Sequence, residues 1–324
     1  MDDLWPRVVP LPGGWKPEPP KRRMIPIRKW EGPLKGLQRG LIASAGCLAV
    51  LSGAASAHGF AGKRFFPATM TIDDSFVAPE LDFLYNNVAV PGEDGGTTYT
   101  SGFSTEFAKT LTRNFQVSFD AAYLHQRLAG GPAYDGFDNV AVGAKYQVFI
   151  HPEAESALAV GVDVDVGGTG NRRVGAESYS TIAPAIYYSK GFGNASNPWL
   201  RPFAITTQFA PTFPTRNGEP HAIEWGFTLQ YSLPYLEDFV KDTGLKPPFR
   251  NVIPIIEFPM ETCLDHGCSG TTGTANPGFV WIGKYQQLGL ELTVPINHAS
   301  GTHIGFMLQY HLYLDDIIPS WSVR

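Results

Sequence analysis

Hydrophobic and polar residues alternate with a period of two along most of this chain. Residues 156–168 show the pattern clearly, with Leu158, Val160, Val162, Val164 and Val166 set between Ala157, Ala159, Gly161, Asp163 and Asp165. Side chains alternate across the two faces of a β-strand, so this segment has one apolar face and one that is small and acidic. A soluble β-sandwich also alternates in this way, so one strand leaves open whether lipid or a protein core covers the valines.

The same alternation recurs at near-constant spacing and predicts twelve antiparallel strands. The predicted strands are 75–89, 98–111, 115–127, 138–150, 156–168, 178–191, 199–211, 221–234, 251–262, 276–283, 286–296 and 303–314. The division of 276–296 depends on a turn at Gly283 to Tyr285. Without that turn there would be eleven strands and the C-terminus would end outside, which single-chain bacterial barrels disfavour because they have even strand numbers.

The residues on the polar faces distinguish a membrane barrel from a soluble sandwich. The outward faces of a sandwich normally carry Lys, Glu and Arg, whereas these faces carry Gly, Ala, Ser, Thr, Gln and isolated acids, which suit an enclosed lumen. The apolar faces are about as long as a tilted strand needs to cross a bilayer, and aromatic residues gather near the strand ends. We therefore expect an all-β fold, a single-chain antiparallel transmembrane β-barrel of about 12 strands, rather than a sandwich or a lipocalin-like barrel.

The lengths of the connections predict the orientation of this barrel. Short turns such as "TLTRNFQ" alternate with long polar loops such as "RLAGGPAYDGFDN" and "CLDHGCSGTTGTANPG". Outer-membrane barrels keep short turns in the periplasm and long loops outside. The predicted location is therefore the bacterial outer membrane, with both chain ends in the periplasm.

The N-terminal part of the sequence predicts export. In "KGLQRGLIASAGCLAVLSGAASAHGF", basic residues precede an apolar core and an Ala-Ser-Ala motif, which is the order of a secretory signal peptide cleaved after Ala57. A buried helix would leave this order unexplained, and Cys47 matches a lipoprotein site poorly. We expect a leader with a cleavable signal peptide at 1–57 and the outer-membrane β-barrel at 58–324. The leader is unusually long, and Met24 would be a more ordinary start.

Charge and motifs exclude several functions. The whole chain has a formal charge of −5, and cleavage after Ala57 would leave 16 basic and 26 acidic residues, a charge of −10, so nucleic acid is not an expected partner. The sequence has no Walker motif, no HExxH, no EF-hand loop and no GxSxG elbow. We therefore expect no enzyme and no cofactor. A membrane-embedded hydrolase with a Ser–His pair is a more distant alternative.

Four segments resemble bacterial outer-membrane proteins that are grouped with the meta-pathway of phenol degradation. They are "HGFAGKRFFPATMTIDDSFVAPEL" (58–81), "PPFRNVIPIIEF" (247–258), "NPGFVWIGKYQQLGLELTVPIN" (276–297) and "LQYHLYLDDIIP" (308–319). The resemblance implies a transporter-like outer-membrane β-barrel that helps aromatic or other hydrophobic compounds to cross. Its partners would be outer-membrane lipid, small-molecule solutes and the barrel-assembly machinery. The resemblance assigns no catalytic or binding residue.

The alternation also assigns charged residues to the lumen. The predicted lumen-lining residues are the acids Glu106, Asp120, Asp163, Asp165, Glu224 and Glu291, together with the base Lys145. Acids confined inside a narrow wall favour cations and repel anions, so we expect passive passage of small neutral or cationic solutes. The alternative is a structural or surface-interaction barrel that does not conduct, in which the acids pair with basic side chains. The sequence leaves an open and a plugged lumen equally acceptable.

The cysteines and histidines offer little evidence for a metal. Cys263 and Cys268 enclose "LDHG" in a predicted exterior loop, and export to an oxidising compartment favours a disulfide between them. The alternative metal site with His266 lacks a visible fourth ligand. Cleavage after Ala57 would put His58 at the mature N-terminus, where its amine and imidazole could chelate copper. We expect no metal site.

Overall fold

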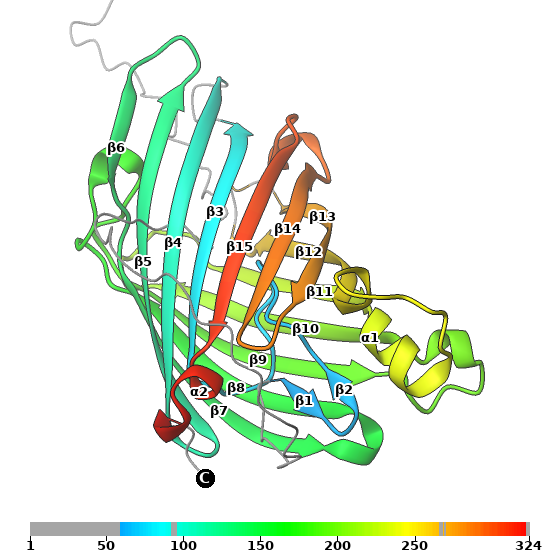
Figure 1. The fold of residues 1–324 in the computed structure, drawn as a ribbon. Coiled ribbons are helices and arrows are strands. Elements are labelled where there is room, and N and C mark those ends of the chain that lie inside the picture. Colours follow the sequence, from blue (N-terminus) through cyan, green and yellow to red (C-terminus); the bar gives the residue numbers. More distant parts are fainter. Residues whose placement is uncertain (1–58, 92–95, 266–267, 269, 322–324) are drawn as a thin grey trace, which may run out of the picture.

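The computed structural model describes residues 59–91, 96–265, 268 and 270–321 (Figure 1). The predicted signal peptide and His58 lie outside the described residues, so the predicted cleavage and the copper hypothesis stay predictions. In the described part of the chain, no helix combines the length and the hydropathy that are needed to cross a lipid bilayer.

Twelve antiparallel strands form a closed barrel, as predicted. They are β3 (Glu80–Pro91), β4 (Thr97–Thr112), β5 (Phe115–Leu128), β7 (Ala141–His151), β8 (Ser156–Asp165), β9 (Thr181–Gly191), β10 (Phe203–Pro214), β11 (Ala222–Tyr231), β12 (Val252–Cys263), β13 (Thr271–Ile282), β14 (Gln286–Pro295) and β15 (Gly305–Tyr313). Each strand pairs with the next, and β15 closes the ring on β3 through pairs from Phe306–Asn87 to Tyr313–Glu80 (Figure 1).

The observed strand boundaries differ from the predicted ones by up to five residues, and two of these differences have a structural reason. The predicted strand 138–150 begins three residues late, as β7 at Ala141, because the short strand β6 (Ala133–Phe137) pairs with the outer end of β5 in its place. The predicted strand 75–89 begins five residues late, at Glu80, because residues 75–79 belong to a segment inside the barrel. The turn at Gly283 to Tyr285 separates β13 from β14 as predicted.

The outer surface of the barrel is apolar over the middle of the strands. Ile186 on β9 is 51% exposed, whereas its neighbour Ala185 is 4% exposed because it faces inward. Phe119, Val142 and Phe209 are exposed in the same way on three other strands. A closed sheet pairs every strand edge, so these side chains can face hydrocarbon without unpaired backbone groups. The chain is thus an outer-membrane type of barrel that is embedded in lipid.

The connections define two rims. An even strand number places the start of β3 and the end of β15 at the same rim, which is called the periplasmic rim after the predicted orientation. Its short helices are η1 (Pro152–Ala154), η3 (Pro198–Leu200), α1 (Leu233–Tyr235), η4 (Leu236–Val240), η5 (Phe249–Asn251), α2 (Leu314–Ile317) and η7 (Pro319–Trp321). The outer rim is the opposite end and carries η2 (Arg172–Val174) and η6 (His298–Ser300).

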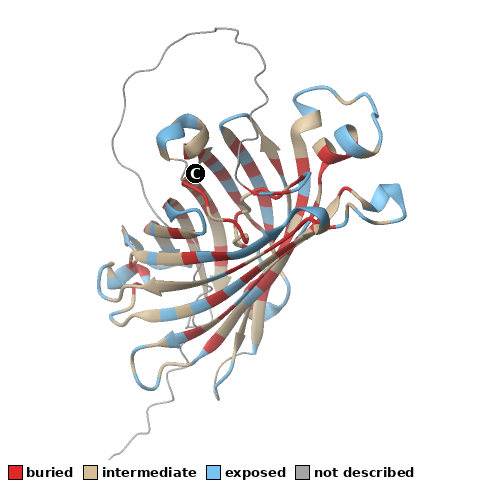
Figure 2. Cartoon of the chain, turned by 90° about the horizontal axis from the view of Figure 1, so that it is seen from below, coloured by how far each residue is buried: buried red, intermediate tan, exposed pale blue. Residues whose placement is uncertain are grey.

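The N-terminal residues 59–79 lie inside the barrel and are called the plug below. The plug begins with a hairpin of β1 (Phe60–Ala61) and β2 (Arg64–Phe65) (Figure 1), and an extended stretch then crosses the interior, where the chain is largely buried (Figure 2). Two apolar clusters hold it against the wall. Met70 packs with Leu84, Ile253, Ile255, Val280 and Met307, and Phe66 and Phe76 pack with Ala61, Ala157 and Ala204. The sequence left undecided whether the lumen is open or plugged, and the structure shows that residues 59–79 occupy it.

Candidate functional site

One carboxylate on the wall binds the middle of the plug. Glu257, fully buried on β12, accepts hydrogen bonds from the backbone N–H groups of Met70 (3.1 Å), Thr71 (2.8 Å) and Ile72 (3.0 Å). The hydroxyls of Thr71 (2.7 Å) and Thr228 (2.9 Å) donate two more. All five partners are donors, so the geometry fits an ionised carboxylate. Hydrogen bonds to a charged group contribute about 1.5–3 kcal/mol each, so this is a strong attachment point.

Glutamine side chains of the wall bind other parts of the plug backbone. The side-chain oxygens of Gln208 and Gln116 accept hydrogen bonds from the backbone N–H groups of Asp73 (3.0 Å) and Ala78 (2.8 Å). The side-chain amides of three other glutamines donate to plug carbonyls: Gln147 to Ser75 (2.6 Å), Gln230 to Phe65 (3.3 Å) and Gln287 to Ala68. A buried extended segment outside a sheet needs such partners for its N–H and C=O groups. The glutamines on the inner faces of the strands therefore hold the plug.

A buried ion pair anchors the start of the plug at the periplasmic rim. Arg64 is fully buried, and its Nε donates to Glu155 Oε2 at 3.2 Å while its two other nitrogens donate to the carbonyls of Pro202 and Arg201. The guanidinium lies over the Tyr235 ring, 3.7 Å from the centroid, and the Tyr235 hydroxyl donates to Glu155 Oε1 at 2.7 Å. Every polar atom of Arg64 is thus directed to a connection of the rim or to the ion pair.

Burial changes the titration of this anchor. It raises the pKa of Tyr235 to about 12, and the hydrogen bond to Glu155 and the charge of that carboxylate act in the same direction. Burial also lowers the pKa of Arg64, and the nearby Glu155 opposes this change. The phenol therefore stays a hydrogen-bond donor at neutral pH, which is what the Glu155 oxygen requires.

The plug fills the periplasmic half of the lumen. Its wall contacts include Gln116, the second residue of β5, and Gln230, the second residue from the end of β11, and both positions are at the periplasmic rim. Two of the predicted lumen acids lie in the outer half instead. Asp165 ends β8, and Glu224 is the third residue of β11, and both are partly exposed at the outer end of their strands.

Five of the seven predicted lumen residues lie on one wall, formed by β4, β5, β7 and β8. They are Glu106, Asp120, Lys145, Asp163 and Asp165, and this set is called the acidic wall below. Glu106 lies opposite Asp120 in the β4–β5 register and interacts electrostatically with Lys145. Asp120 in turn interacts with Asp163 and Asp165.

Lys145 connects the acidic wall to the plug. Its ammonium group donates to Asp73 Oδ1 at 2.8 Å and to the Asp74 carbonyl at 3.2 Å. The same ammonium group lies 4.8 Å from the centroid of the Tyr187 ring, and the Tyr187 hydroxyl donates to Asp163 Oδ2 at 3.1 Å. The single predicted base is therefore neutralised largely by the plug, and the acids of the wall outnumber it.

The other two predicted lumen acids lie apart from that wall. Glu224 faces Glu261 across the β11–β12 pair near the outer rim. Glu291 lies fully buried on β14, where its polar neighbours are Glu257 and Asn276. The structure thus distributes the predicted residues over one wall and two separate pairs rather than one ring.

Several charged residues of the interior are not among the predicted ones. Asp73 and Asp74 lie on the plug, just before the predicted strand 75–89. His311 bridges two acids of β3, with Nδ1 3.3 Å from Asp82 and Nε2 3.4 Å from Glu80. Glu257 could have been found by extending the alternation through "VIPIIEFPMETC", where two prolines obscure the pattern.

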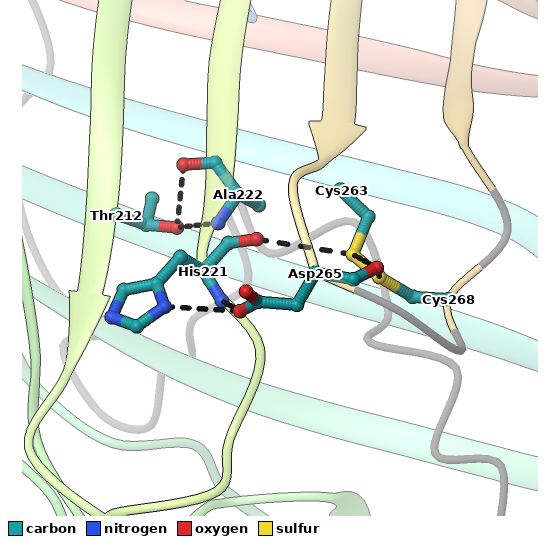
Figure 3. The surroundings of a disulfide bond; sticks show 6 residues. All are labelled: Thr212, His221, Ala222, Cys263, Asp265 and Cys268. Carbon is teal, nitrogen blue, oxygen red and sulfur yellow. Dashed lines mark hydrogen bonds and ion pairs between the residues drawn. A yellow bond between two sulfur atoms is a disulfide. The ribbon is translucent and has the colours of Figure 1, made fainter.

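The two cysteines are joined by a disulfide bond at the outer rim (Figure 3). Beside it, Asp265 accepts hydrogen bonds from the backbone N–H of His221 at 2.6 Å, and the Nδ1 atom of that histidine lies 3.0 Å from the same oxygen. The loop is thereby tied to the start of β11. Within the described residues no group of three or more His, Cys, Asp or Glu has the arrangement of a metal site, and His266 lies outside them.

A groove of about 530 Å³ lies on the lipid-facing side of the wall rather than in the lumen. Its lining includes Ile186, Phe209, Trp225 and Phe227, which belong to β9, β10 and β11. The first three are also among the exposed side chains of the apolar belt. The groove is therefore part of the surface that lipid covers.

Comparisons with known proteins agree with the fold. No family model and no curated protein matches the sequence. Among solved structures, the chain is similar to the COG4313 outer membrane channel from Pseudomonas putida F1, with 12% identity, a TM-score of 0.51 and coverage of 73% of this chain and 96% of that chain. It is also similar to KdgM porin, with 10% identity, a TM-score of 0.42 and coverage of 72% and 98%. At 12% identity, the likeness to the channel from Pseudomonas putida F1 shows the fold alone, an outer-membrane β-barrel.

Proposed function

We propose that this protein is a passive outer-membrane channel for small solutes and that its acidic wall favours neutral and cationic ones. The observation that carries the proposal is the acidic wall itself. Asp163 and Asp165 remain partly exposed on the inner face of the outer half of the barrel, and Lys145, the base on that wall, is occupied by the plug. Charges of one sign in a confined lumen raise the local concentration of counter-ions and exclude anions.

The plug sets the size of the solutes in this proposal. It occupies the periplasmic half of the lumen, where two apolar clusters pack it against the wall. Its polar contacts with the wall glutamines are single neutral hydrogen bonds, which water or a polar solute can replace at a net cost of about 1 kcal/mol each. We therefore expect small conductance steps rather than those of a general porin.

The solutes include hydrophobic and aromatic compounds in this proposal. Its support is the resemblance of four sequence segments to outer-membrane proteins grouped with the meta-pathway of phenol degradation. The structure from Pseudomonas putida F1, which the chain resembles in fold, is described as an outer membrane channel. In this proposal the barrel-assembly machinery inserts the protein into the membrane. Depletion of that machinery should then remove the protein from the outer membrane.

Single-channel recording in planar bilayers tests the proposal. The wild-type barrel should give small steps, and its reversal potential in a KCl gradient should have the sign of cation preference. Replacing both acids in D163N/D165N should reduce that preference, whereas Glu153→Gln, a matched change on an exposed turn of the periplasmic rim, should leave it unchanged. Liposome swelling with phenol and with an anionic analogue of similar size extends the test to organic solutes.

The competing function is a structural barrel that does not conduct, and the occupied lumen is the observation in its favour. Absence of steps from both the wild type and a variant that lacks residues 59–72 would support that function. Anion preference in the wild type would equally contradict the proposed channel.

A further inference from the structure

A buried group of polar side chains on the wall has no hydrogen-bond partners. Glu291 on β14 and Asn276 on β13 are both 0% exposed. Among the described residues, neither oxygen of the Glu291 carboxylate and neither polar atom of the Asn276 amide has a hydrogen-bond partner. Buried polar atoms are almost always paired, so four orphaned atoms in two adjacent side chains indicate a missing ligand.

The strand register brings these groups together with Glu257. Glu257 on β12 lies directly opposite Asn276 on β13, and Glu291 on β14 lies opposite Gly278, two residues further along β13. Gly278 makes the room for this arrangement. A Cβ atom at that position would lie 2.6 Å from Glu291 Cγ and 2.1 Å from the Leu290 carbonyl oxygen. The three polar side chains therefore share one inward-facing surface, and the Glu291 carboxylate interacts electrostatically with Glu257.

The surroundings leave the charge of Glu291 without compensation. Glu257 already accepts five hydrogen bonds, so it adds a second negative charge and no donor. On the other side lies the apolar cluster that includes Met307, whose backbone pairs with that of Glu291 in the β14–β15 register. An ionised carboxylate that is buried beside a second one, without a counter-charge, costs several kcal/mol.

We propose that Glu257, Asn276 and Glu291 form a binding site for a hard cation of the calcium class. Two carboxylates and an amide oxygen are the ligand types that Ca²⁺ takes in proteins. The side chains of Asn276 and Glu291 are fully buried, and a bare ion needs less room between them than a water molecule does. A calcium ion lies about 2.3–2.6 Å from its oxygen ligands, closer than the roughly 2.8 Å of a hydrogen bond from water. The ion would satisfy the three orphaned oxygens.

The site lies beside the main attachment of the plug. An ion bound to Glu257 and Glu291 bridges β12 and β14 and holds the carboxylate that binds Met70, Thr71 and Ile72. Cation binding therefore stabilises the seated plug. This inference does not depend on whether the barrel conducts.

Calorimetric titration of the purified barrel in detergent, first stripped with EDTA, tests the site with CaCl₂ as the probe. The wild type should bind one ion. Glu291→Gln, which keeps the shape but removes the charge, should weaken binding about 100-fold or more, since ligand charge sets calcium affinity. The matched control is Glu224→Gln, which removes one acid from the other cross-strand acidic pair and should bind as the wild type does.

A gain-of-affinity variant keeps the test informative if Glu291→Gln fails to fold. Asn276→Asp adds a third carboxylate, so it should bind Ca²⁺ about tenfold more tightly and should lose thermal stability in EDTA. The inference is overturned if the wild type binds no Ca²⁺ at millimolar concentration, or if Glu291→Gln binds as the wild type does. It is also overturned if Asn276→Asp gains no affinity.

Discussion

Truncation of Arg64 should release the start of the plug. In Arg64→Ala, the buried side chain that carries the anchor is removed, together with its ion pair to Glu155 and its two hydrogen bonds to rim carbonyls. The contact with the Tyr235 ring is lost as well. Glu155 then keeps the Tyr235 hydroxyl and the Gly193 N–H at 3.1 Å but loses its only counter-charge among these contacts.

The size of the effect follows from these contacts. Each charge-assisted hydrogen bond contributes about 1.5–3 kcal/mol, and removal of one partner from a buried ion pair costs about 3–5 kcal/mol because the other charge is left buried. We use the cost of about 3–5 kcal/mol for breaking the ion pair, because that cost already includes the loss of its hydrogen bond. At about 1.4 kcal/mol per factor of ten, the population of the released plug should rise roughly 150- to 4,000-fold.

Thiol labelling measures that population directly. Ser75 is fully buried in the seated plug, where its hydroxyl donates to Ser189 at 2.9 Å, so a cysteine at this position can react with a bulky maleimide only after release. Cys263 and Cys268 are joined to each other and do not compete. The labelling rate of Ser75→Cys should therefore rise by the same factor when Arg64→Ala is added.

A control at the same rim separates this effect from a general loss of charge. Arg250 forms an ion pair with Asp238, and both side chains are largely exposed. Such surface pairs contribute about 0–1 kcal/mol, so Arg250→Ala should change the labelling rate less than about fivefold. If Arg64→Ala labels no faster than Arg250→Ala, the plug is not held by this anchor and the reasoning fails.

Two further predictions concern the lumen and the lipid face. Lys145→Met removes the ammonium group that neutralises Asp73. The reversal potential in a KCl gradient should therefore move further toward that of a cation-selective pore. An unchanged potential would show that this wall does not line the path of the ions. Leu290→Arg places a charge on the lipid face near the middle of β14 and should reduce folding stability in lipid vesicles by about 2–4 kcal/mol, whereas Ile304→Arg at the outer rim should cost about 0–1 kcal/mol. Equal costs for the two arginine variants would contradict the orientation of the strands.

The sequence by itself determined the barrel. Alternation with a period of two is a local property, because it depends only on which side of the strand each side chain leaves. It therefore identified the twelve strands and the outward direction of residues such as Val160 and Leu290. The predicted orientation in the membrane also rests on local information, because loop lengths can be read directly from the chain.

Only the tertiary structure decided what the lumen contains. Residues 75–79 continue a plausible strand, and nothing in their own pattern shows that they lie inside the ring, since a strand and a buried extended segment have the same backbone preferences. Their partners, such as Gln116 and Ser189, are distant in sequence and come together only when the barrel closes.

The grouping of the charges was decided in the same way. Alternation gives the face on which an acid lies but not its height on the wall or its neighbours around the ring. Those depend on strand register, which is set by every pair in the closed sheet. The register places Glu106 opposite Asp120 but separates Glu291 from both and sets it beside Glu257. Local alternation therefore fixes which residues face inward, whereas the closed barrel fixes which of them meet.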